Sequence, residues 1–382
     1  WSSDVCSSDL KGCVIMEKKN VVVIGYGGMG GWHTRMICGN KVENDGYKPP
    51  ENLENGSDVV NLKGIYDIKP ERCELAEKRG LHAYSSFEEV LADPEVDILT
   101  LAVPNDCHKE LAIRAMAAGK NVISEKPVTL SSADLQEMFD ASEKYGKLFT
   151  VHQNRRWDAD FLAMKEVYES GKLGYVFNIE SRVHGSRGIP GDWRQRKVHG
   201  GGMMLDWGVH LIDQMLMMIP EKVSTVYAKM DHITNDEVDD GFKMDVTFES
   251  GLVYRIEVGT TNFISLPRWY MQGAVGTALM QTFDTHTGEY VVYRNDDEGE
   301  VKPVVTAAGL TKTMAPRKPS SLDHYEMPEL SPDVHDFYRN VCKAIDGKET
   351  QIVTHPQMMR VMKLMEAAFE SDKLGRPVAF EK

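Results

Sequence analysis

The chain has 382 residues, a length that suits two domains with a cleft between them better than a single domain. Its 58 acidic and 44 basic residues give a formal net charge of −14, which disfavours nucleic acid and anionic membranes as partners. The six cysteines form no C-x-x-C pair, and no apolar run reaches the roughly 18 residues of a membrane-spanning helix. We therefore expect a cytoplasmic protein with free thiols.

The first residues stand apart from the rest. The opening WSSDVCSSDL resembles the translation of a sequencing-library adapter, so we predict that residues 1–15 are a non-native leader before Met16. Cys6 would then have no biological meaning.

Strand and helix patterns alternate from residue 21 to about residue 150. The apolar run 21–25 is typical of a buried parallel strand, and a helix is predicted from Gly30 to Cys38. A long polar insert, 40–58, follows that helix. Further strands are predicted at 59–67, 96–104 and 121–127, and helices at 70–80, 108–120 and 132–146; the pattern changes after residues 148–156. This alternation predicts an α/β fold with a doubly wound parallel sheet.

The second half of the chain has a different pattern. Strand-like segments separated by turns, at 175–185, 224–233, 241–250, 252–263 and 289–295, predict an α+β domain with an open, largely antiparallel sheet. A helix at 202–218 could cover it, 306–330 is predicted to be a long loop or arm, and helices at 331–347 and 355–375 close the chain. Because an uncovered sheet face favours association, we expect a homodimer or homotetramer.

A glycine motif follows the first strand. Gly25, Gly27 and Gly30 have G-x-G-x-x-G spacing at the point where a strand ends and a helix begins. In that context the first glycine permits a tight turn, the second lets a pyrophosphate approach, and the third packs helix on strand. The phosphates would lie at the N-terminus of the helix, where free N–H groups favour an anion. The motif predicts a dinucleotide site.

An acidic residue after the second strand would complete such a site. Asp67 is the candidate, although it lies 37 residues after Gly30 rather than the usual ~20, because the polar insert lengthens the connection. Its carboxylate would accept hydrogen bonds from the adenosine ribose and repel a ribose phosphate, which favours NAD over NADP. Lys69 and Arg72 soften that preference, and a simple turn aspartate is the alternative reading.

Two further motifs bring proton-transfer groups. SEKP places Glu125, Lys126 and Pro127 at the carboxyl end of a strand, where ligands of open α/β sheets bind. Asp206 and His210 stand four residues apart, on one face of a predicted helix, and histidine is a natural proton acceptor near neutral pH. Two potential ligands without a further cluster do not predict a metal site.

These motifs, VVVIGYGGMG, VPNDCH, AAGKNVISEKP, HQNRRWD and GGGMMLDWGVHLID, together resemble the glucose-fructose oxidoreductase, inositol dehydrogenase and rhizopine catabolism (Gfo/Idh/MocA) family. The resemblance runs from about Val21 to the closing helix. It implies an N-terminal Rossmann domain and a C-terminal α/β domain, with catalytic roles for Lys126, Asp206 and His210. The cofactor contacts that it implies are Gly25, Tyr26, Gly27, Gly28, Met29, Gly30, Asp67, Ile68, Pro104, Asn105, His108, Glu125 and Lys126.

The substrate side of the cleft is less strongly indicated. Asp206, His210, Arg155, Trp157, Trp193 and Arg194 are the candidates, and Trp157 could equally be a residue that packs the two domains together. His33 matches the family pattern, but we interpret it as a packing histidine of the first helix. The insert after Cys38 and the loop near Lys312 depart from the family pattern, so substrate identity and oligomer geometry do not follow from the resemblance.

Our hypothesis is an NAD-dependent dehydrogenase with residues 16–150 as the NAD-binding domain and 151–382 as the substrate and oligomerisation domain, whose closing helices return towards the first domain. His210 would remove the hydroxyl proton while hydride leaves the same carbon, with Lys126 on the oxygen and Asp206 fixing the substrate and His210. By resemblance the substrate is a sugar, a cyclitol or a glycoside oxidised at ring position 3. A glycosidase that oxidises its substrate transiently, and a non-catalytic sugar-sensing regulator, are the alternatives.

Overall fold

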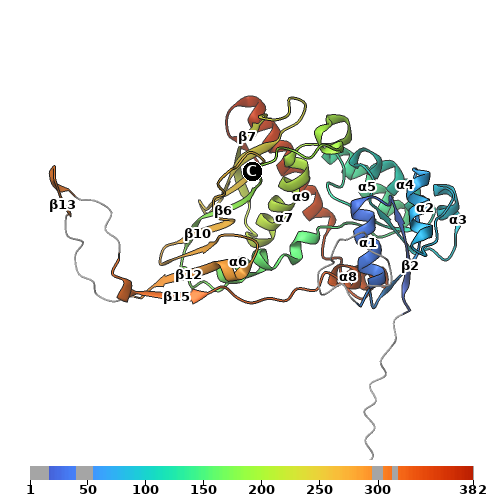
Figure 1. Cartoon of the computed structure of the whole chain (residues 1–382), viewed down its shortest axis with the longest axis horizontal. Helices are drawn as coiled ribbons and strands as arrows, with labels where there is room; N and C mark the ends of the chain where they lie inside the picture. Colours follow the sequence, from blue (N-terminus) through green and yellow to red (C-terminus); the bar gives the residue numbers. More distant parts are fainter. Residues whose placement is uncertain (1–16, 40–54, 295–303, 312–316, 382) are drawn as a thin grey trace, which may run out of the picture.

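The computed structural model describes residues 17–39, 55–294, 304–311 and 317–381. The predicted leader 1–15, most of the insert after Cys38 and the loop at Lys312 lie outside the described residues. The two larger sheets each have their own helices, and the C-terminal helix α9 lies between them (Figure 1).

The first sheet has five parallel strands in the order β2-β1-β3-β4-β5, which confirms the predicted doubly wound fold. Every residue of β3 is buried, as expected for a strand covered on both faces. The connections change direction after β2, so right-handed crossovers place α1 on one face and the following helices on the other. The strands are β1 Lys19–Ile24, β2 Val60–Tyr66, β3 Ile98–Leu101, β4 Asn121–Ser124 and β5 Phe149–Val151; the helices are α1 Gly28–Cys38, α2 Pro70–Lys78, α3 Phe87–Ala92, α4 His108–Ala117 and α5 Ser132–Tyr145.

The second sheet has nine strands in the order β15-β12-β11-β10-β6-β9-β8-β7-β16. Only β6 and β9 pair in parallel, and the other neighbours are antiparallel, as the sequence predicted. The strands are β6 Val176–His184, β7 Val223–Asp231, β8 Gly241–Phe248, β9 Val253–Gly259, β10 Trp269–Gly273, β11 Gly276–Met280, β12 Gly288–Tyr293, β15 Leu322–Glu326 and β16 Val378–Ala379.

Buried and exposed residues alternate along this sheet, so it has one inner and one outer face. In the paired strands β7 and β8, Val226 and Val246 are both buried, whereas the next residue, Tyr227, is exposed. The inner face packs against the helices α6 Ala159–Glu169, α7 Val209–Met218 and α9 His355–Leu374.

Several elements differ from the sequence prediction. Helices α3 and α6 and strands β10 and β11 were not predicted, and α1 begins at Gly28 rather than at Gly30. The predicted loop 306–330 contains β15, whose backbone pairs with β12 at the edge of the sheet. The first residues of this predicted loop belong to a hairpin formed by β13 Val304–Thr306 and β14 Gly309–Thr311. The hairpin lies away from the nine-stranded sheet in Figure 1. Short, weakly periodic strands give too little sequence signal when partner strands supply their stability.

The closing helices connect the two sheets. Helix α8, Asp336–Ile345, lies against α1, and just before it His335 Nε2 is 3.1 Å from the carbonyl oxygen of Met36. Helix α9 begins with a capping box formed by Thr354 and Gln357 and packs against β7, α7 and α5. The short helices are η3 Asn105–Cys107, η4 Asn154–Trp157, η5 Trp193–Gln195, η6 Lys197–His199, the π-helix η7 Met204–Gly208, η8 Thr285–Thr287 and η9 Pro319–Ser321.

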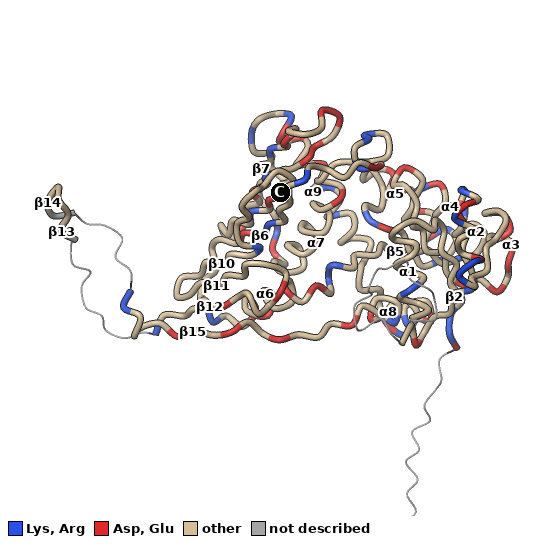
Figure 2. The backbone as a smooth tube through the Cα atoms, viewed as in Figure 1, with Lys and Arg blue, Asp and Glu red and all other residues tan. Residues whose placement is uncertain are grey.

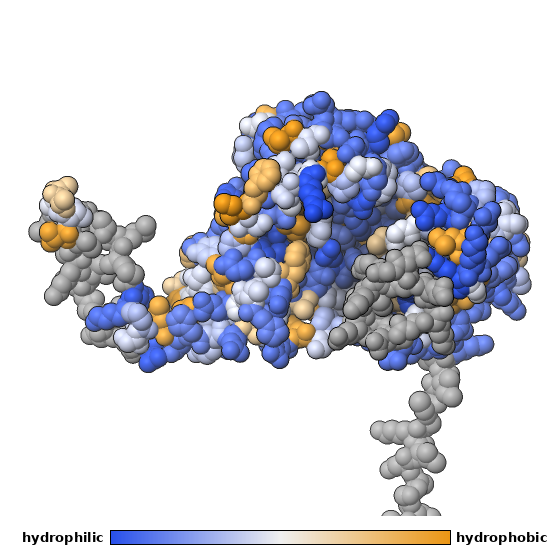
Figure 3. Space-filling model, in the orientation of Figure 1, coloured by the Kyte–Doolittle hydropathy of each residue, from blue (hydrophilic) through white to orange (hydrophobic). Residues whose placement is uncertain are grey.

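The surface is mainly polar. Figure 2 shows acidic and basic residues interspersed along both halves of the chain, and on the face seen in Figure 3 hydrophobic side chains form small separate patches. Within the described ranges, no helix combines the length and the apolar character needed to cross a membrane.

Candidate active site

The glycine loop lies between the carboxyl end of β1 and the start of α1. Gly25 has φ +92°, and a Cβ there would lie 2.4 Å from the carbonyl oxygen of Ala102, so only glycine fits. A Cβ on Gly30 would lie 1.8 Å from the carbonyl oxygen of Gly25, which is the close packing of helix on strand that the motif predicts.

The rest of the loop has room for a cofactor. Cβ atoms on Gly27 and Gly28 would meet no atom of the described residues within 4 Å, and both glycines are exposed. The N-terminus of α1 has no side-chain cap and no acidic residue in its first turn. Its backbone N–H groups therefore suit a pyrophosphate, and the loop fits a dinucleotide.

Asp67 follows β2 and faces the glycine loop. Its Oδ2 accepts a hydrogen bond of 2.6 Å from the backbone N–H of Tyr26, and its Oδ1 accepts one of 2.9 Å from the backbone N–H of Lys69. The carboxylate thus fixes the loop, and each oxygen keeps a further lone pair for a ribose hydroxyl. Ile68, the next residue, is exposed, and Met29 is partly buried. Both side chains are therefore accessible to a cofactor.

The segment after β3 holds three predicted cofactor residues. Pro104 is exposed, whereas Asn105 is buried and donates from Nδ2 to the carbonyl oxygen of Gly200 at 3.0 Å. His108 is fully buried, with Nδ1 3.1 Å from the carbonyl oxygen of Pro127 and Nε2 3.0 Å from that of Val103. We therefore correct the predicted cofactor contact of His108, because both of its ring nitrogens face the backbone of the two loops.

Lys126 and Asp206 come together across the boundary between the two sheets. The Lys126 ammonium donates to Asp206 Oδ1 and to the Asp206 carbonyl oxygen, both at 2.9 Å, and the two side chains are only 14% and 10% exposed. Arg194 Nε donates to the other oxygen, Oδ2, at 3.0 Å. Burial acts to raise the pKa of Asp206, but the charges of Lys126 and Arg194 and their hydrogen bonds hold it below its usual value. Asp206 is a carboxylate shared by two cations.

His210 lies on the same segment as Asp206 but is not oriented by it. The turn from Met204 to Gly208 is a π-helix, and α7 begins only at Val209. Among the described residues no hydrogen bond joins the Asp206 carboxylate to His210, so the expected orientation of the imidazole by Asp206 is not formed in this structure. The Asp206 carboxylate is taken up by Lys126 and Arg194 instead.

The imidazole of His210 is buried and uncharged. Its Nδ1 has no hydrogen-bond partner among the described residues. Burial, followed by repulsion from Lys126 and Arg155, places the pKa of His210 well below its usual value. A neutral imidazole next to a lysine can accept a proton from a bound molecule.

Arg155, in the short helix η4, contacts Trp207, a neighbour of His210. Its guanidinium stands 4.0 Å from the centroid of the Trp207 ring, and NH1 donates to Asp158 Oδ2 at 2.9 Å. Trp207 is 6.1 Å from the His210 ring and 6.3 Å from that of Phe283, which is 45% exposed. Arginine and aromatic side chains thus form one wall next to His210.

The two predicted tryptophans differ in position. Trp157 is partly buried against the core, and its ring lies perpendicular to that of Phe337 at a centroid distance of 6.1 Å. This contact agrees with the alternative that Trp157 is a packing residue. Trp193 is partly exposed and lies under the Arg194 guanidinium, 4.6 Å from its ring centroid, so Trp193 stays near Asp206.

Glu125 points into the interior. Its Oε1 accepts hydrogen bonds of 2.8 Å from His33 Nε2 and His152 Nδ1, and all three side chains are buried. His33 therefore forms a hydrogen bond as well as packing, as predicted, against neighbouring rings such as those of Trp32 and Tyr338. The cofactor contact of Glu125 stays a prediction. Within the described part of the chain Glu125, His33 and His152 are also the one group close enough to hold a metal ion.

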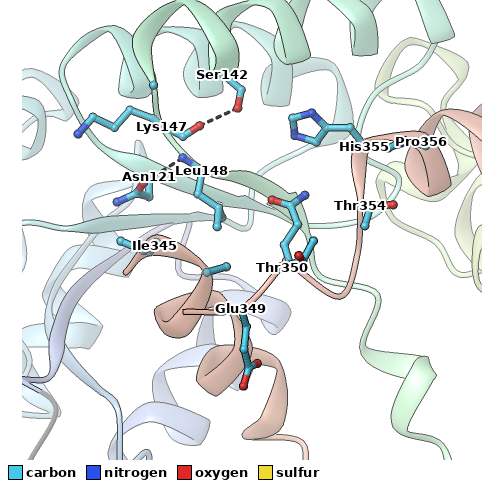
Figure 4. Close-up of a pocket in the computed structure, with 13 residues that line it drawn as sticks. Asn121, Ser142, Lys147, Leu148, Ile345, Glu349, Thr350, Thr354, His355 and Pro356 are labelled. Atoms are coloured by element: carbon cyan, nitrogen blue, oxygen red, sulfur yellow. Dashed lines mark hydrogen bonds between the residues drawn. The ribbon is translucent and has the colours of Figure 1, made fainter. Parts of the chain in front are cut away.

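A cavity outside this centre lies elsewhere in the described structure. It measures about 560 Å³ and lies near the amino ends of β4 and β5, between α5 and the start of α9 (Figure 4). Asn121 and His355 line it, and no predicted site residue does. Ligands of open α/β sheets bind at the carboxyl ends of the strands, so this cavity is not the candidate active site.

Sequence reasoning missed several residues around the site. His152 follows β5 directly, so its strand-end position, the same signal that revealed Lys126, could have identified it. Trp207, Phe283 and Tyr338 gave no such signal, because their positions depend on contacts between distant segments.

Comparison with known proteins gives a consistent result. Residues 19–153 match the description "Oxidoreductase family, NAD-binding Rossmann fold", and residues 161–279 match "GFO/IDH/MocA C-terminal domain". A solved structure of an NAD-binding protein from Listeria innocua is 43% identical, covers 96% of this chain and 100% of that one, and superposes with a TM-score of 0.86. An uncharacterized oxidoreductase of Schizosaccharomyces pombe is 28% identical over 76% of this chain and 83% of its own length. The scyllo-inositol 2-dehydrogenase (NADP(+)) of Bacillus subtilis is 25% identical over 85% and 90%.

The fold, the glycine loop and these matches define the class: an oxidoreductase with a Rossmann domain of the NAD-binding family. More narrowly, the chain belongs to the Gfo/Idh/MocA family, because both characteristic parts of that family match in order along one chain.

Proposed function

We propose that this oxidoreductase is an NAD-dependent dehydrogenase that transfers a hydride between the nicotinamide and a secondary alcohol of a cyclitol, sugar or glycoside. The observation that supports this most is the Lys126 ammonium at the carboxyl end of β4, held by Asp206 close to the neutral imidazole of His210. A proton donor, a proton acceptor and a dinucleotide loop then face the same edge of the sheet.

The chemistry of Lys126 follows from its donors. An ammonium group has three N–H donors, and two of them go to Asp206. The third can be donated to the substrate oxygen, where it stabilises the negative charge that develops when the hydroxyl proton leaves. Asp206 positions the ammonium for this role and compensates its charge.

His210 accepts the hydroxyl proton. Its low pKa keeps the imidazole neutral at pH 7, so its basic nitrogen is free to take the proton in the oxidative direction. The cofactor, when bound, supplies the hydride acceptor at its nicotinamide ring. In the reductive direction His210 returns the proton to the same oxygen.

Asp67 supports NAD as the cofactor. Its carboxylate would repel a phosphate on the adenosine ribose, and it stands at the end of β2, where that ribose is expected. The name of the Bacillus relative specifies NADP(+), so the two cofactors must be compared directly on this chain.

The wall formed by Arg155, Trp207 and Phe283 supports a polyhydroxy ring as the substrate. Aromatic faces pack against the apolar face of a sugar ring, and the guanidinium donates to its hydroxyl groups. A cyclitol is the first candidate because the Bacillus relative is named for scyllo-inositol. Glucosides oxidised at ring position 3 are the second.

The test is incubation of the chain with NAD or NADP and a panel of inositols, free sugars and glucosides. Substrate-dependent NADH formation with an oxidised product supports the proposal. Release of an aglycone without net NADH would instead indicate the glycosidase, and a response to NADP alone would overturn the choice of cofactor.

A lysine variant tests the mechanism. Lys126→Ala should lower kcat by roughly 10²–10⁴-fold, the usual contribution of a positioned proton-transfer group, and leave the Kd for NAD within about threefold. Lys243→Ala removes an exposed lysine of β8 that pairs with Asp231, and should leave both unchanged as the matched control. An undiminished rate in Lys126→Ala contradicts the assigned role.

We also propose that the chain is a homodimer or homotetramer. The outer face of the nine-stranded sheet exposes Phe177 and Tyr227, and such a face is suited to contact with a second copy. Light scattering on the eluting peak of a size-exclusion column decides this, and a monomer mass across the concentration range overturns it.

A further inference from the structure

A buried chain of hydrogen bonds lies directly behind Lys126. Glu125 Oε1 accepts from His33 Nε2 and from His152 Nδ1, each at 2.8 Å, and Glu125 Oε2 accepts from the backbone N–H of Lys126 at 3.2 Å. The two histidines come from α1 and from the segment after β5. The carboxylate therefore connects three segments at the carboxyl edge of the parallel sheet.

The chain continues into helix α8 through Tyr338. Its hydroxyl lies 3.1 Å from His33 Nδ1 and 2.9 Å from Thr100 Oγ1. Because His33 Nε2 must carry a proton to donate to a carboxylate, a neutral His33 has a bare Nδ1 that accepts from Tyr338. The Tyr338 hydroxyl then accepts from Thr100. Each hydrogen bond between Glu125, His33, Tyr338 and Thr100 then has one donor and one acceptor.

The charges agree with this arrangement. Burial acts to raise the pKa of Glu125, but attraction and a hydrogen bond from His152, together with the hydrogen bond from His33, place it well below its usual value. Burial and repulsion from His152 lower the pKa of His33, although Glu125 acts in the opposite direction. Glu125 is thus an anion at neutral pH, and His33 is neutral.

The same three residues could be taken for a metal site, but their geometry is that of hydrogen bonds. Both histidine nitrogens stand 2.8 Å from one and the same oxygen, Glu125 Oε1. Nitrogen and oxygen ligands at about 2.0–2.1 Å from a tetrahedral zinc lie roughly 3.3 Å from each other. The observed spacing leaves room for a proton between each pair.

We propose that His33, His152 and Tyr338 are positioning residues, which hold Glu125 as a fixed negative charge behind Lys126 and make helix α8 part of the support of the active site. This inference rests on the proposed function. The fixed charge lies at the carboxyl end of β4, the edge where dinucleotides bind in open α/β sheets. It favours the positively charged oxidised nicotinamide over the neutral reduced ring.

The charge is tested by Glu125→Gln, which keeps the size and removes the anion. The dissociation constants of NAD⁺ and NADH are measured separately by calorimetry. We expect the ratio of the NAD⁺ constant to the NADH constant to rise about tenfold, equivalent to about 1.4 kcal/mol. An unchanged ratio overturns the proposal. Since this measurement needs no turnover, it gives an answer even if no substrate is found and the proposed function fails.

The positioning role is tested by Tyr338→Phe, which removes the hydroxyl and keeps the buried ring. We expect kcat to fall about tenfold, with the KM for NAD within twofold, because an indirectly acting group affects the transition state more than binding. Tyr254→Phe, at a fully buried tyrosine of β9, is the matched control and should leave kcat unchanged.

Two results would contradict the assignment. An unchanged kcat in Tyr338→Phe removes α8 from the support of the site. Binding of one equivalent of Zn²⁺ or Co²⁺ to the wild-type chain, lost in His33→Asn, would make the cluster a metal site rather than a hydrogen-bonded support.

Discussion

Replacement of Asp206 by asparagine should destabilise the protein more than replacement of either of its partners. Asp206 compensates two cations at once, with Lys126 Nζ at 2.9 Å and Arg194 Nε at 3.0 Å. At an effective dielectric constant of about 20, each attraction amounts to about 6 kcal/mol before desolvation is deducted. Asp206→Asn leaves both cations without a countercharge, and we expect a loss of about 3–5 kcal/mol in the free energy of unfolding.

Lys126→Met should cost less, about 1–2 kcal/mol, because the Asp206 carboxylate keeps its hydrogen bond with Arg194. In the double variant Lys126→Met, Asp206→Asn the losses should not add, since one of the two uncompensated cations is gone. Urea unfolding followed by tryptophan fluorescence gives all four free energies.

The control is an exposed pair. Asp245→Asn breaks the bidentate contact with Arg255, whose side chain is 48% exposed, and should cost less than about 1 kcal/mol. If Asp206→Asn costs no more than Asp245→Asn, or if the losses at Lys126 and Asp206 add, then Asp206 is not a desolvated carboxylate shared by two cations.

Two further predictions concern the glycine loop and the response to pH. Gly27→Ala should leave Tm unchanged but weaken NAD binding more than tenfold, because its Cβ enters open space that the cofactor needs; Gly30→Ala should lower Tm, because its Cβ collides with the carbonyl oxygen of Gly25. Equal effects of the two changes on Tm would contradict this distinction. Burial raises the pKa of Asp239 to about 6, although its Oδ2 accepts a hydrogen bond of 2.7 Å from the Met204 N–H. Because the folded protein holds the Asp239 proton more tightly than the unfolded chain does, protonation of Asp239 stabilises the fold. This stabilisation is complete below the unfolded pKa and is lost as pH rises through about 6. Asp239→Asn, which keeps the acceptor oxygen, should therefore gain about 1.4 kcal/mol of stability relative to wild type between pH 5 and pH 7, and unfolding curves of constant difference across that range would refute the assignment.

Much of the fold could be predicted because the local signals were strong. The valine run before Gly25 and the strand-helix alternation specify a parallel sheet, since each strand buried on both faces is apolar throughout. Helix α6 and the strands β10, β11 and β15 were not predicted from the sequence. Their residues are stabilised by neighbours in the second sheet, and that partnership leaves little trace in their own periodicity.

The site could be predicted in its members but not in its pairings. Lys126 stood out because it follows a strand, and Asp206 and His210 because they are polar residues in an apolar stretch. The expected hydrogen bond of Asp206 with His210 is not formed, because Lys126 and Arg194 occupy the two carboxylate oxygens, and the spacing of Asp206 and His210 along the chain does not reveal this.

The sequence by itself determined the dinucleotide loop and the family, because these depend on backbone constraints within a few consecutive residues, such as the space that only Gly25 and Gly30 leave. Only the tertiary structure decided which carboxylate serves which cation. Asp206 meets Lys126 across 80 residues of chain, and Tyr338 meets His33 across 305. Such contacts depend on how the two sheets and α8 pack, since burial makes an unpaired charge costly and so selects the partner that packing brings within reach.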